Sequence, residues 1–396
     1  MGWTIRPATD DEIPALVRAD WAAFSGQPDD TQIADSRAFL EVDRAFVAVD
    51  GDRIVGAGGG LSLELTVPGP ATVPTAGVTY VGVMPTHRRQ GILTALMAQV
   101  LDDARRRGEP LAALLASEST IYGRFGFGVA VTVSTVEIER AHARFRQPVD
   151  VSGRVRMLEP DELAGVLPAI WDRYRRRQPG EVSRSKGWWT RRLRDDPLFR
   201  PAGGGPRFAV VWEDGEGYVT YRVAQLWDNG LPRHTLIVED LVATSPEVRA
   251  GLWQFCFGVD LVGTVRALNQ PLDDPLRWSL VDPRRLRTTA VNDLLWVNVL
   301  DVEAALSART YASEQSLVFD VAGAGRFRVA GGQCRRTDDL ADLGIEAADL
   351  GAAYLGGVSF ATLARAGRVA EVAAGAVARA DAAFATAPGP ASCTGF

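Results

Sequence analysis

The chain has 396 residues, of which 46% are hydrophobic and 23% are charged, an ordinary composition for a globular protein. This length exceeds what a single hydrophobic core usually supports, so we expect two or three domains. The formal net charge of −6 argues against a general role in binding nucleic acid.

The cysteines and the N-terminal residues bear on where the protein acts. Cys256, Cys334 and Cys393 are scattered and form no CxxC pair, so we predict neither a metal site nor a disulfide framework. The N-terminal residues turn acidic early and lack the apolar core of a signal peptide. No apolar run approaches the roughly 20 residues that span a bilayer. We therefore expect a cytoplasmic protein with no membrane segment.

The first elements alternate between strand and helix patterns. Residues 3–8 predict a short strand. Asp10 or Asp11 can cap a helix whose apolar residues recur at helical spacing as far as Phe24. Residues 44–65 predict two strands joined by a tight turn.

Four glycines, at positions 56 and 58–60, interrupt the second of these two strands. A dinucleotide-binding loop is one interpretation, but a helix should follow such a loop, whereas the pattern here continues as a strand. We favour a bulge or the close approach of a ligand.

The next stretch predicts a further strand at 76–83 and a helix with one apolar face at 92–107, which Gly108 ends. Residues 111–117 form a short apolar run that predicts a buried strand, and residues 129–139 predict another strand.

The same order of patterns repeats from about residue 151. Residues 155–177 predict a strand and a helix, 207–223 a pair of strands, and 234–258 a strand, a proline and a helix. Generic alternation of strands and helices is one interpretation. We favour a duplicated fold whose second copy has lost a phosphate site, because no RRxG sequence precedes its helix.

The last part of the chain predicts a third, α+β unit. Residues 316–337 have a strand-like pattern. Residues 339–367 and 377–385 are rich in Ala and Leu and predict helices.

Two segments, 171–177 and 184–194, combine arginine with tryptophan. Such segments can bind nucleic acid. Because the protein is acidic, we predict solvated helix faces or subunit contacts instead.

The sequence VTYVGVMPTHRRQGILTAL contains the pattern that indicates a ligand-binding site. A strand ends, Pro85 breaks it, and the residues Arg88-Arg89-Gln90-Gly91 open a helix. The unpaired amides at a helix N-terminus receive phosphates, and a glycine there lets the backbone approach closely. The two arginines add fixed positive charge. A P-loop would need GK[ST], which is absent. A diphosphate held beside an apolar strand suits coenzyme A.

This stretch resembles the acyl-CoA site of the GCN5-related N-acetyltransferases (GNAT), whose motif is R/Q-x-x-G-x-G/A. Arg88 and Gly91 fit that motif, and Leu93 replaces its final small residue. With ASE and IYGRFGFG downstream, and with the end of the chain, the sequence resembles one branch over its whole length: the enhanced-intracellular-survival (Eis) acetyltransferases of actinobacteria.

The resemblance implies an α/β fold class with mixed sheets, in which two tandem GNAT-like folds precede a sterol-carrier-protein-like α+β domain. The expected divisions are a catalytic domain at 1–150, a degenerate GNAT-like domain at 151–290, and the third domain at 291–396. The C-terminal tail of the third domain is expected to reach the active site of the first.

The resemblance also assigns roles in binding the co-substrate acetyl-CoA. The implied contacts are Val81, Gly82, Val83, Arg88, Arg89, Gln90, Gly91, Ile92, Leu93, Thr94, Ser117 and Glu118. The Val81 N–H would polarise the thioester carbonyl. Alternatively, Val81 and Val83 are core residues of a strand, Arg88 is a surface charge, and Glu118 is an acid at a helix N-terminus.

Residues 121–128 read IYGRFGFG, and Tyr122 matches the general acid of the family. When an amine attacks acetyl-CoA, the departing thiolate needs a proton. A tyrosine, with a pKa of about 10, is protonated at neutral pH and suits that role. Gly123 and Gly126 let the chain turn sharply around it. The alternative is a buried tyrosine whose hydroxyl has a structural partner.

The chain ends in ASCTGF, and the resemblance implies that the α-carboxylate of Phe396 is the base. A carboxylate of pKa about 3.5 is weak for this task, so it must be raised by burial, act through water, or mainly attract the cation. A disordered tail is the alternative. Trp21 and Phe24 are expected to line the substrate pocket, or else to belong to the core.

The implied reaction is direct attack of a primary amine on acetyl-CoA, because no Cys or Ser has a nucleophile motif with a partner base. Aminoglycosides and other polyamines are the implied acceptors, although Gly26 and Gly395 offer no acidic side chain to bind them. Lysine side chains of proteins or peptides are the alternative acceptors. A non-catalytic sensor of CoA or lipid is the alternative function. A homohexamer is also implied, with no nucleic-acid, membrane or metal partner.

Overall fold

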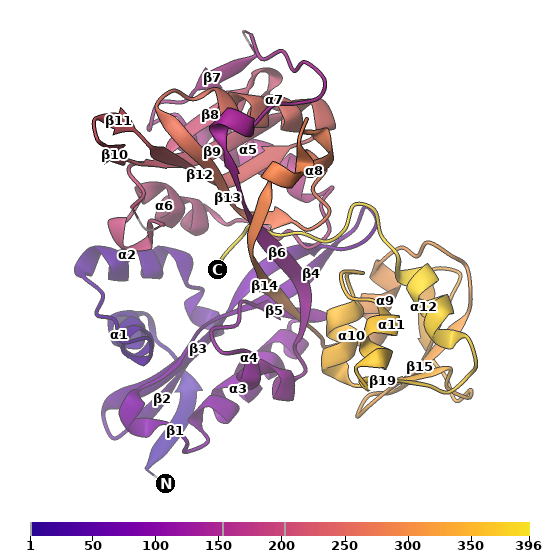
Figure 1. Cartoon of the computed structure of the whole chain (residues 1–396). Helices are drawn as coiled ribbons and strands as arrows, with labels where there is room; N and C mark the ends of the chain where they lie inside the picture. The colour runs from indigo at the N-terminus through magenta and orange to yellow at the C-terminus, as the bar shows by residue number, and fades with distance from the viewer. Residues whose placement is uncertain (1, 153, 202) are drawn as a thin grey trace.

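The chain forms three units, of which the first and second share one long sheet and the third docks at its side (Figure 1). The computed structural model describes residues 2–152, 154–201 and 203–396. In chain order the first unit contains β1 (Trp3–Pro7), α1 (Ile13–Ala23), α2 (Asp30–Phe39), β2 (Ala45–Asp50), β3 (Arg53–Thr66), β4 (Thr72–Val83), α3 (Ile92–Arg106), β5 (Leu111–Leu114), α4 (Ser119–Tyr122) and β6 (Gly128–Glu139).

These elements confirm the strands and helices predicted for the first part of the chain. The predicted cap of α1 is wrong. Asp10 and Asp11 lie inside a short 3-10 turn, and Glu12 stands at the N-cap without a side-chain hydrogen bond. β4 begins four residues earlier than predicted, at Thr72.

The second unit repeats the order of the first. It contains β7 (Val155–Met157), α5 (Leu163–Arg175), α6 (Lys186–Arg194), β8 (Phe208–Trp212), β9 (Gly217–Ala224), β10 (Trp227–Asp228), β11 (Leu231–Pro232), β12 (His234–Ala243), α7 (Pro246–Gly258), β13 (Val262–Pro271), α8 (Leu276–Ser279) and β14 (Arg287–Val299). In both units a pair of parallel strands flanks a crossover helix, namely β4 and β5 around α3, and β12 and β13 around α7. The predicted duplication is therefore confirmed.

The third unit packs helices against a five-stranded sheet of order β17-β16-β15-β18-β19. Its elements are α9 (Val302–Ala308), β15 (Leu317–Val321), β16 (Gly325–Ala330), β17 (Gln333–Arg336), β18 (Leu343–Ile345), α10 (Ala347–Ala353), α11 (Phe360–Arg365), β19 (Val369–Glu371) and α12 (Ala376–Phe384). The prediction of helix throughout 339–367 is wrong at Leu343–Ile345. These residues pair in parallel with β15, so sheet pairing overrides their helical pattern.

The first two units exchange their last strands. The long sheet has the order β1-β2-β3-β4-β5-β14-β6-β13-β12-β9-β8-β7. β6 ends the first unit but pairs with β13 of the second, and β14 ends the second unit but pairs with β5 of the first. The two exchanged strands also pair with each other. The expected division at 290 falls inside β14 and, like the division at 150, stays a prediction.

The bulge predicted at the glycines of β3 lies on the facing strand, β4. One residue of β3, Gly58, faces two residues of β4, because the register changes between Ala57 and Gly59. The close approach at these glycines is made by α3: a Cβ on Gly56 would lie 3.2 Å from the Ile92 side chain, and one on Gly58 3.5 Å from Leu96.

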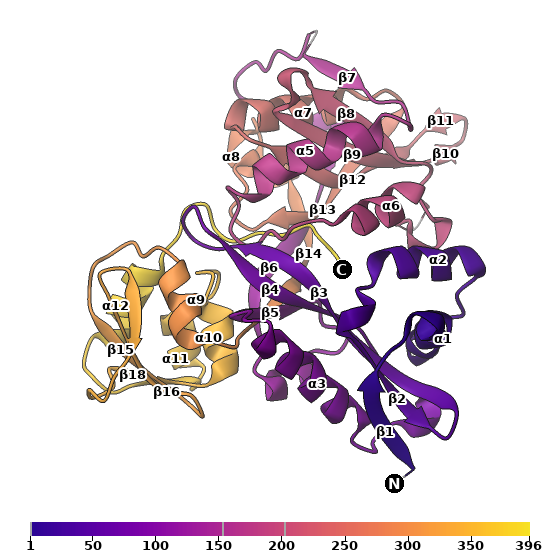
Figure 2. The same cartoon turned by 180° about the vertical axis from the view of Figure 1, so that it is seen from behind.

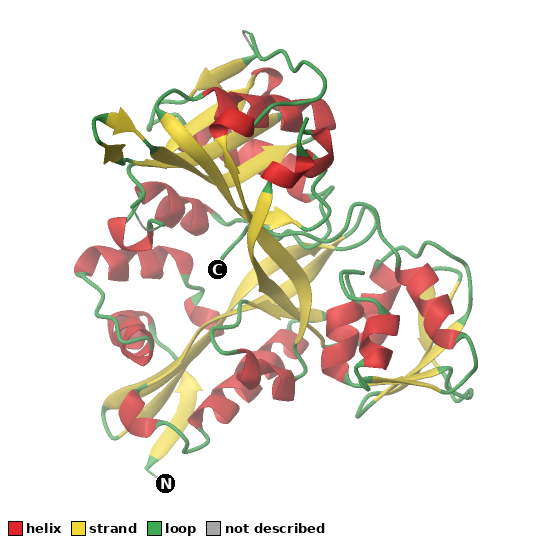
Figure 3. Cartoon of the chain, in the orientation of Figure 1, coloured by secondary structure: helices red, strands yellow, loops and turns green. Residues whose placement is uncertain are grey.

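The third unit docks on the exchanged strands through α10 (Figures 1 and 3). A Cβ on Gly351 of α10 would overlap the carbonyl oxygen of Val297 in β14, and one on Gly128 of β6 would overlap the carbonyl oxygen of Ala348. Glycine is thus required on both sides of this contact. No helix in the described part of the chain is long and apolar enough to cross a membrane.

Gly351→Ala should destabilise the protein by about 1–3 kcal/mol, because the added methyl group overlaps the backbone of β14. Gly165→Ala in α5 is the matched control, since nothing lies within 4 Å of a Cβ there. That change should stabilise the helix by up to about 1 kcal/mol. Thermal denaturation followed by circular dichroism measures both. A Gly351→Ala protein as stable as the control would mean that α10 does not pack directly on the sheet.

Candidate active site

The site begins where β4 and β5 separate. The two strands pair only from Thr75 to Gly77 on β4, opposite residues 111–113 of β5. Beyond Gly77 the edge of β4 that faces β5 is left free as far as Val83, and α4 lies across the opening. An extended chain-like ligand can pair with such a free strand edge.

A bulge shapes this free stretch of β4. Tyr80 and Val81 together face the single residue Gly58 of β3, and Tyr80 has a φ of +53°. A bulge leaves one residue outside the hydrogen-bonded ladder and redirects the side chains beside it. Val81 therefore lies at the interruption of the ladder, which is where an N–H group free to bind a ligand is expected.

The N-terminus of α3 opens onto the same stretch. Gly91 is its N-cap, with a φ of +85° and no side-chain cap, and Arg89 has a φ of +62°. The Arg88 guanidinium donates a hydrogen bond of 2.8 Å to the Ala23 carbonyl at the end of α1, so Arg88 has a structural partner.

In the second unit the corresponding helix end is closed. The Ser245 side chain accepts a hydrogen bond from the Val248 N–H, and Pro246 removes one donor from the first turn of α7. The different caps support the prediction that only the first copy keeps an anion site at this helix.

A cleft of about 490 Å³ runs between β4, the start of α3, and α4. We call it the α3 cleft. Of the twelve residues predicted to contact acetyl-CoA, eleven line it: Val81, Gly82, Val83, Arg88, Arg89, Gly91, Ile92, Leu93, Thr94, Ser117 and Glu118. Gln90 is exposed and is not among the residues that line it.

Gly82 lines the α3 cleft where β4 packs against α1. A Cβ at this position would lie 3.0 Å from the Cα of Asp20, 3.0 Å from its Oδ1 and 3.0 Å from the Cβ of Ala23. Glycine is therefore needed at position 82 because α1 packs against β4. The narrow cleft, the glycine N-cap of α3 and the arginines beside it fit an extended ligand that carries phosphates.

A second cavity, of about 480 Å³, adjoins the α3 cleft at Phe24, Val81, Ser117 and Tyr122, which line both. We call it the α1 cavity. Its wall comes from α1, α2, β4 and α4 of the first unit, from α6 and residues 198–199 of the second, and from Phe396. Trp21 and Phe24, the residues expected to line a substrate pocket, both line this cavity, and Trp21 also packs edge-on against Phe199, with ring centroids 6.1 Å apart.

Tyr122 lies where the two spaces meet. It lines both the α3 cleft and the α1 cavity, and only 5% of it is exposed. It is the last residue of α4, and the chain turns back at Gly126, where φ is +88°. Burial raises the pKa of Tyr122, the Ser117 side chain opposes this, and the charges of Asp20 and Glu118 add to it. Its hydroxyl is therefore protonated at neutral pH.

The C-terminal tail is held along the second unit and ends in the α1 cavity (Figures 1 and 2). Glu181 accepts hydrogen bonds from the Cys393 N–H at 3.0 Å and from the hydroxyl of Ser392 at 3.2 Å. Trp188 donates its Nε1–H to the Gly395 carbonyl at 2.6 Å. The Phe396 ring lies against β4, 3.3 Å from where a Cβ on residue 77 would stand.

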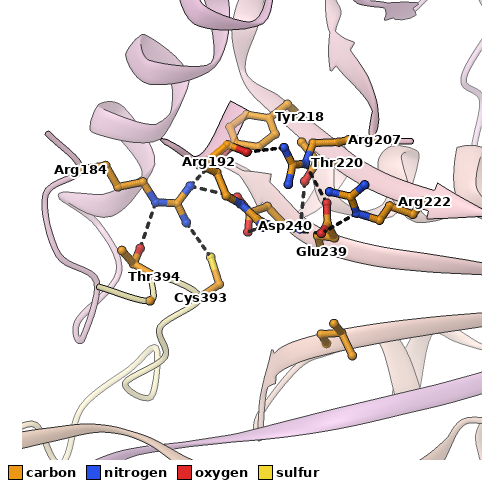
Figure 4. Close-up of polar contacts among 12 residues, drawn as sticks. Arg184, Arg192, Arg207, Tyr218, Thr220, Arg222, Glu239, Asp240, Cys393 and Thr394 are labelled. Atoms are coloured by element: carbon orange, nitrogen blue, oxygen red, sulfur yellow. Dashed lines mark hydrogen bonds and ion pairs between the residues drawn. The ribbon is translucent and has the colours of Figure 1, made fainter. Parts of the chain in front are cut away.

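Arg184 is the centre of this attachment (Figure 4). Its buried guanidinium donates to the Thr394 hydroxyl at 3.0 Å and to Asp240 at 2.9 Å. It also stacks on Trp171, 3.4 Å from the ring centroid. Since a buried charge must be paired, Arg184 ties the tail to the sheet of the second unit.

Four charged residues of the α1 cavity, Asp20, Asp35, Arg191 and Arg194, were not predicted. Asp20 of α1 is buried, and burial raises its pKa to about 6, opposed by the positive charge of Arg191. Arg191 and Arg194 come from α6, and Arg194 pairs with Asp35 of α2. Asp20 could have been found, because it interrupts the apolar stripe that begins at Ile13.

The prediction of solvated helix faces at 171–177 and 184–194 holds only in part, and that of subunit contacts stays a prediction. Arg173, Arg176 and Arg177 are exposed, whereas Trp188 and Trp189 are buried, and Arg191 and Arg194 line the α1 cavity. Arg175 is buried as well and pairs across the units with Glu64 of β3, at 2.6 Å.

Models of known protein families match three parts of the chain. A model described as an acetyltransferase (GNAT) domain matches residues 4–130, and a second model with that description matches residues 180–299. A model described as a sterol carrier protein domain matches residues 302–392. The three matches follow the order of the three units.

Relatives are similar over almost the whole chain. An uncharacterized N-acetyltransferase of Streptomyces avermitilis is 42% identical over 402 residues, which cover 96% of this chain and 98% of that protein. The N-acetyltransferase Eis of Mycobacterium tuberculosis is 35% identical over 398 residues, covering 97% of both chains. The crystal structure of Eis1 from Mycobacterium abscessus is similar with a TM-score of 0.89 and 36% identity, covering 99% of this chain and 100% of that one.

Arg184→Met should destabilise the protein by about 3–5 kcal/mol, because the buried carboxylate of Asp240 would lose the guanidinium that pairs with it at 2.9 Å. It should also free the tail, so that carboxypeptidase releases Phe396 faster than from the wild type. Arg176→Met is the control: this half-exposed arginine pairs with Asp172, and its loss should cost about 1 kcal/mol or less. Equal release of Phe396 from both variants would mean that Arg184 does not hold the tail.

Proposed function

The chain belongs to the Eis-type family of GNAT N-acetyltransferases, enzymes of class EC 2.3.1, and on this premise we propose that it transfers the acetyl group of acetyl-CoA to a primary amine, with Tyr122 as acid and the Phe396 carboxylate as base. One observation carries this proposal. The α3 cleft and the α1 cavity meet at Tyr122, and the C-terminal residue lines the second of them. A donor and an acceptor bound in these two spaces would meet at one tyrosine.

The α3 cleft is the proposed site of acetyl-CoA. The free edge of β4 would pair with the pantetheine arm, and the unpaired amides at the start of α3, with Arg89, would bind the pyrophosphate. The bulge of β4 supports Val81 as the donor to the thioester oxygen, because its backbone lies where the ladder is interrupted.

The α1 cavity is the proposed site of the amine. The nitrogen lone pair attacks the thioester carbon, a C–N bond forms, and the C–S bond then breaks. The proton that the nitrogen loses during attack goes to the Phe396 carboxylate. The proton of the Tyr122 hydroxyl goes to the departing sulfur, and tyrosine regains it from solvent. Tyr122 keeps its proton at neutral pH, because burial raises its pKa, although the same shift makes it a weaker acid toward the sulfur.

The terminal carboxylate is a weak base for a free ammonium, whose pKa is near 10. We therefore place its action at the moment when the nitrogen, already bonded to the carbonyl carbon, has become much more acidic. Gly26 lines the α1 cavity without contributing a carboxylate, so aminoglycosides should be weak acceptors. The cytoplasmic location and the homohexamer that the resemblance implies stay predictions.

Tyr122→Phe should lower kcat by about 10²–10⁴-fold while the affinity for acetyl-CoA changes little, because only the acid is removed. Adding one alanine after Phe396 moves the carboxylate by up to about 3.6 Å and should lower kcat/KM by about 100-fold. Thiol release from acetyl-CoA measures both, with a panel of monoamines, polyamines, aminoglycosides and lysine peptides.

Tyr311→Phe is the matched control, because that hydroxyl donates to the Leu306 carbonyl in the third unit, far along the chain from the site. It should keep wild-type kcat. Full activity of Tyr122→Phe would exclude Tyr122 as the acid, and full activity of the extended chain would exclude the terminal carboxylate as the base. A wild type that binds acetyl-CoA but acetylates no amine would overturn the proposed function.

A further inference from the structure

Asp20 carries a carboxylate on the apolar face of α1. It lies on the buried stripe of α1 that also contains Ile13, Leu16 and Val17, and only 9% of it is exposed. It lines the α1 cavity, and among the described residues its Oδ1 atom has no hydrogen-bond partner. A buried carboxylate oxygen without a hydrogen-bond partner costs free energy, which a positively charged ligand can recover.

The position of Asp20 puts it beside the reacting atoms. Its Oδ1 lies 3.0 Å from where a Cβ on Gly82 would stand, one residue from Val81, the proposed donor to the thioester oxygen. Tyr122, which is shared by the two spaces, is close enough for the charge of Asp20 to raise its pKa. A group bound to Asp20 would therefore lie next to the end of the α3 cleft that faces the α1 cavity.

The cations of the α1 cavity already have partners. Arg194 pairs with Asp35 and, at 3.3 Å, with Asp196. Arg191 stacks between two aromatic rings, 5.1 Å from the Phe39 centroid and 5.8 Å from that of Phe199. The group that is missing opposite Asp20 is thus a cation small enough to enter from the cavity.

We propose that Asp20 binds the ammonium group of the acceptor and takes its first proton, and that the acceptor carries a single positive charge on an apolar body. This inference rests on the proposed function. An ammonium must lose two protons to become an amide nitrogen. The first passes to Asp20 in the small fraction of the ion pair that exists as neutral acid and neutral amine, a fraction that grows because burial raises the pKa of Asp20 toward that of the ammonium, and this leaves a neutral amine with a free lone pair. The second passes to the Phe396 carboxylate as the C–N bond forms, while Tyr122 protonates the sulfur, so one proton is released per turnover.

The walls of the α1 cavity define the rest of the acceptor. Trp21, Phe24 and Phe199 offer aromatic surface to an alkyl or aryl group. Arg191 and Arg194 line the same cavity and repel a second positive charge. A monoamine such as 2-phenylethylamine fits this combination, whereas spermidine and kanamycin bring further positive charges close to Arg191 and Arg194.

The charged and titratable groups that face Asp20 set its pH dependence. They are Arg191 of α6, Tyr80 of β4 and Tyr122 of α4, and the paired Asp35 and the C-terminal residue Phe396 line the same cavity. Burial outweighs the attraction of Arg191 and raises the pKa of Asp20 to about 6. Below that pH the carboxyl group is neutral and cannot bind an ammonium, so binding of the amine should weaken as pH falls through 6.

The test measures amine binding apart from turnover. Isothermal titration of the CoA-loaded protein with 2-phenylethylamine at pH 7.5 should give a dissociation constant at least tenfold weaker for Asp20→Asn than for the wild type. Asp11→Asn, an exposed acid just before α1, is the control and should bind as the wild type does. Acetyl-CoA affinity and the melting temperature check that Asp20→Asn is folded, and the wild type alone should lose amine affinity between pH 7 and pH 5.

Kinetics complete the test. In the wild type, kcat/KM for 2-phenylethylamine should exceed that for spermidine at least tenfold, and its acidic limb near pH 6 should be absent from Asp20→Asn. Equal amine affinity in Asp20→Asn and the wild type, or a preference for spermidine, would overturn this inference. Amine binding that depends on Asp20 without any acetylation would overturn the proposed function and leave the ammonium site standing.

Discussion

The exchange of the last strands between the first two units is the constraint on which the rest of the structure depends. β6 finds its partners in β13 and β14, and β5 finds its second partner in β14, so neither unit completes its sheet without the other. The backbone hydrogen bonds of these strands fix the two units in one register. The third unit then docks on the exchanged strands, where Gly128 and Gly351 allow backbone to touch backbone.

The proposed site is built across that fixed arrangement. The α3 cleft belongs to the first unit alone, but α6 and residues 198–199 of the second unit close the α1 cavity, and the tail of the third ends in it. Arg184 links the last two, since one guanidinium binds both Asp240 in the sheet and Thr394 in the tail (Figure 4). The second copy of the fold thus serves as the wall and the tail anchor of the first copy's site, and its own helix end is closed by Ser245.

Local patterns in the sequence were enough to predict much of the fold and of the proposed site. The alternation of strands and helices predicts most elements, and Arg88 to Gly91 mark the open end of α3 because a helix start depends on neighbouring residues. What depends on distant contacts was not predictable. β18 is a strand only because β15 pairs with it, and β14 crosses to the first unit. The burial of Asp20 follows from the packing of α1 on β3 and β4, and the place of Arg191 in the cavity from the packing of α6 on α2 across the units, although a lone acid on an apolar stripe was a usable signal.

In the proposed reaction, donor and acceptor are bound together, in two spaces that meet at Tyr122, and the acetyl group passes directly between them. Initial rates measured while both acetyl-CoA and a reactive amine are varied distinguish direct transfer from an acetylated enzyme. Direct transfer predicts intersecting double-reciprocal lines, because both substrates must be present before any thiol is released. Parallel lines would reveal an acetylated enzyme as intermediate and would contradict direct transfer.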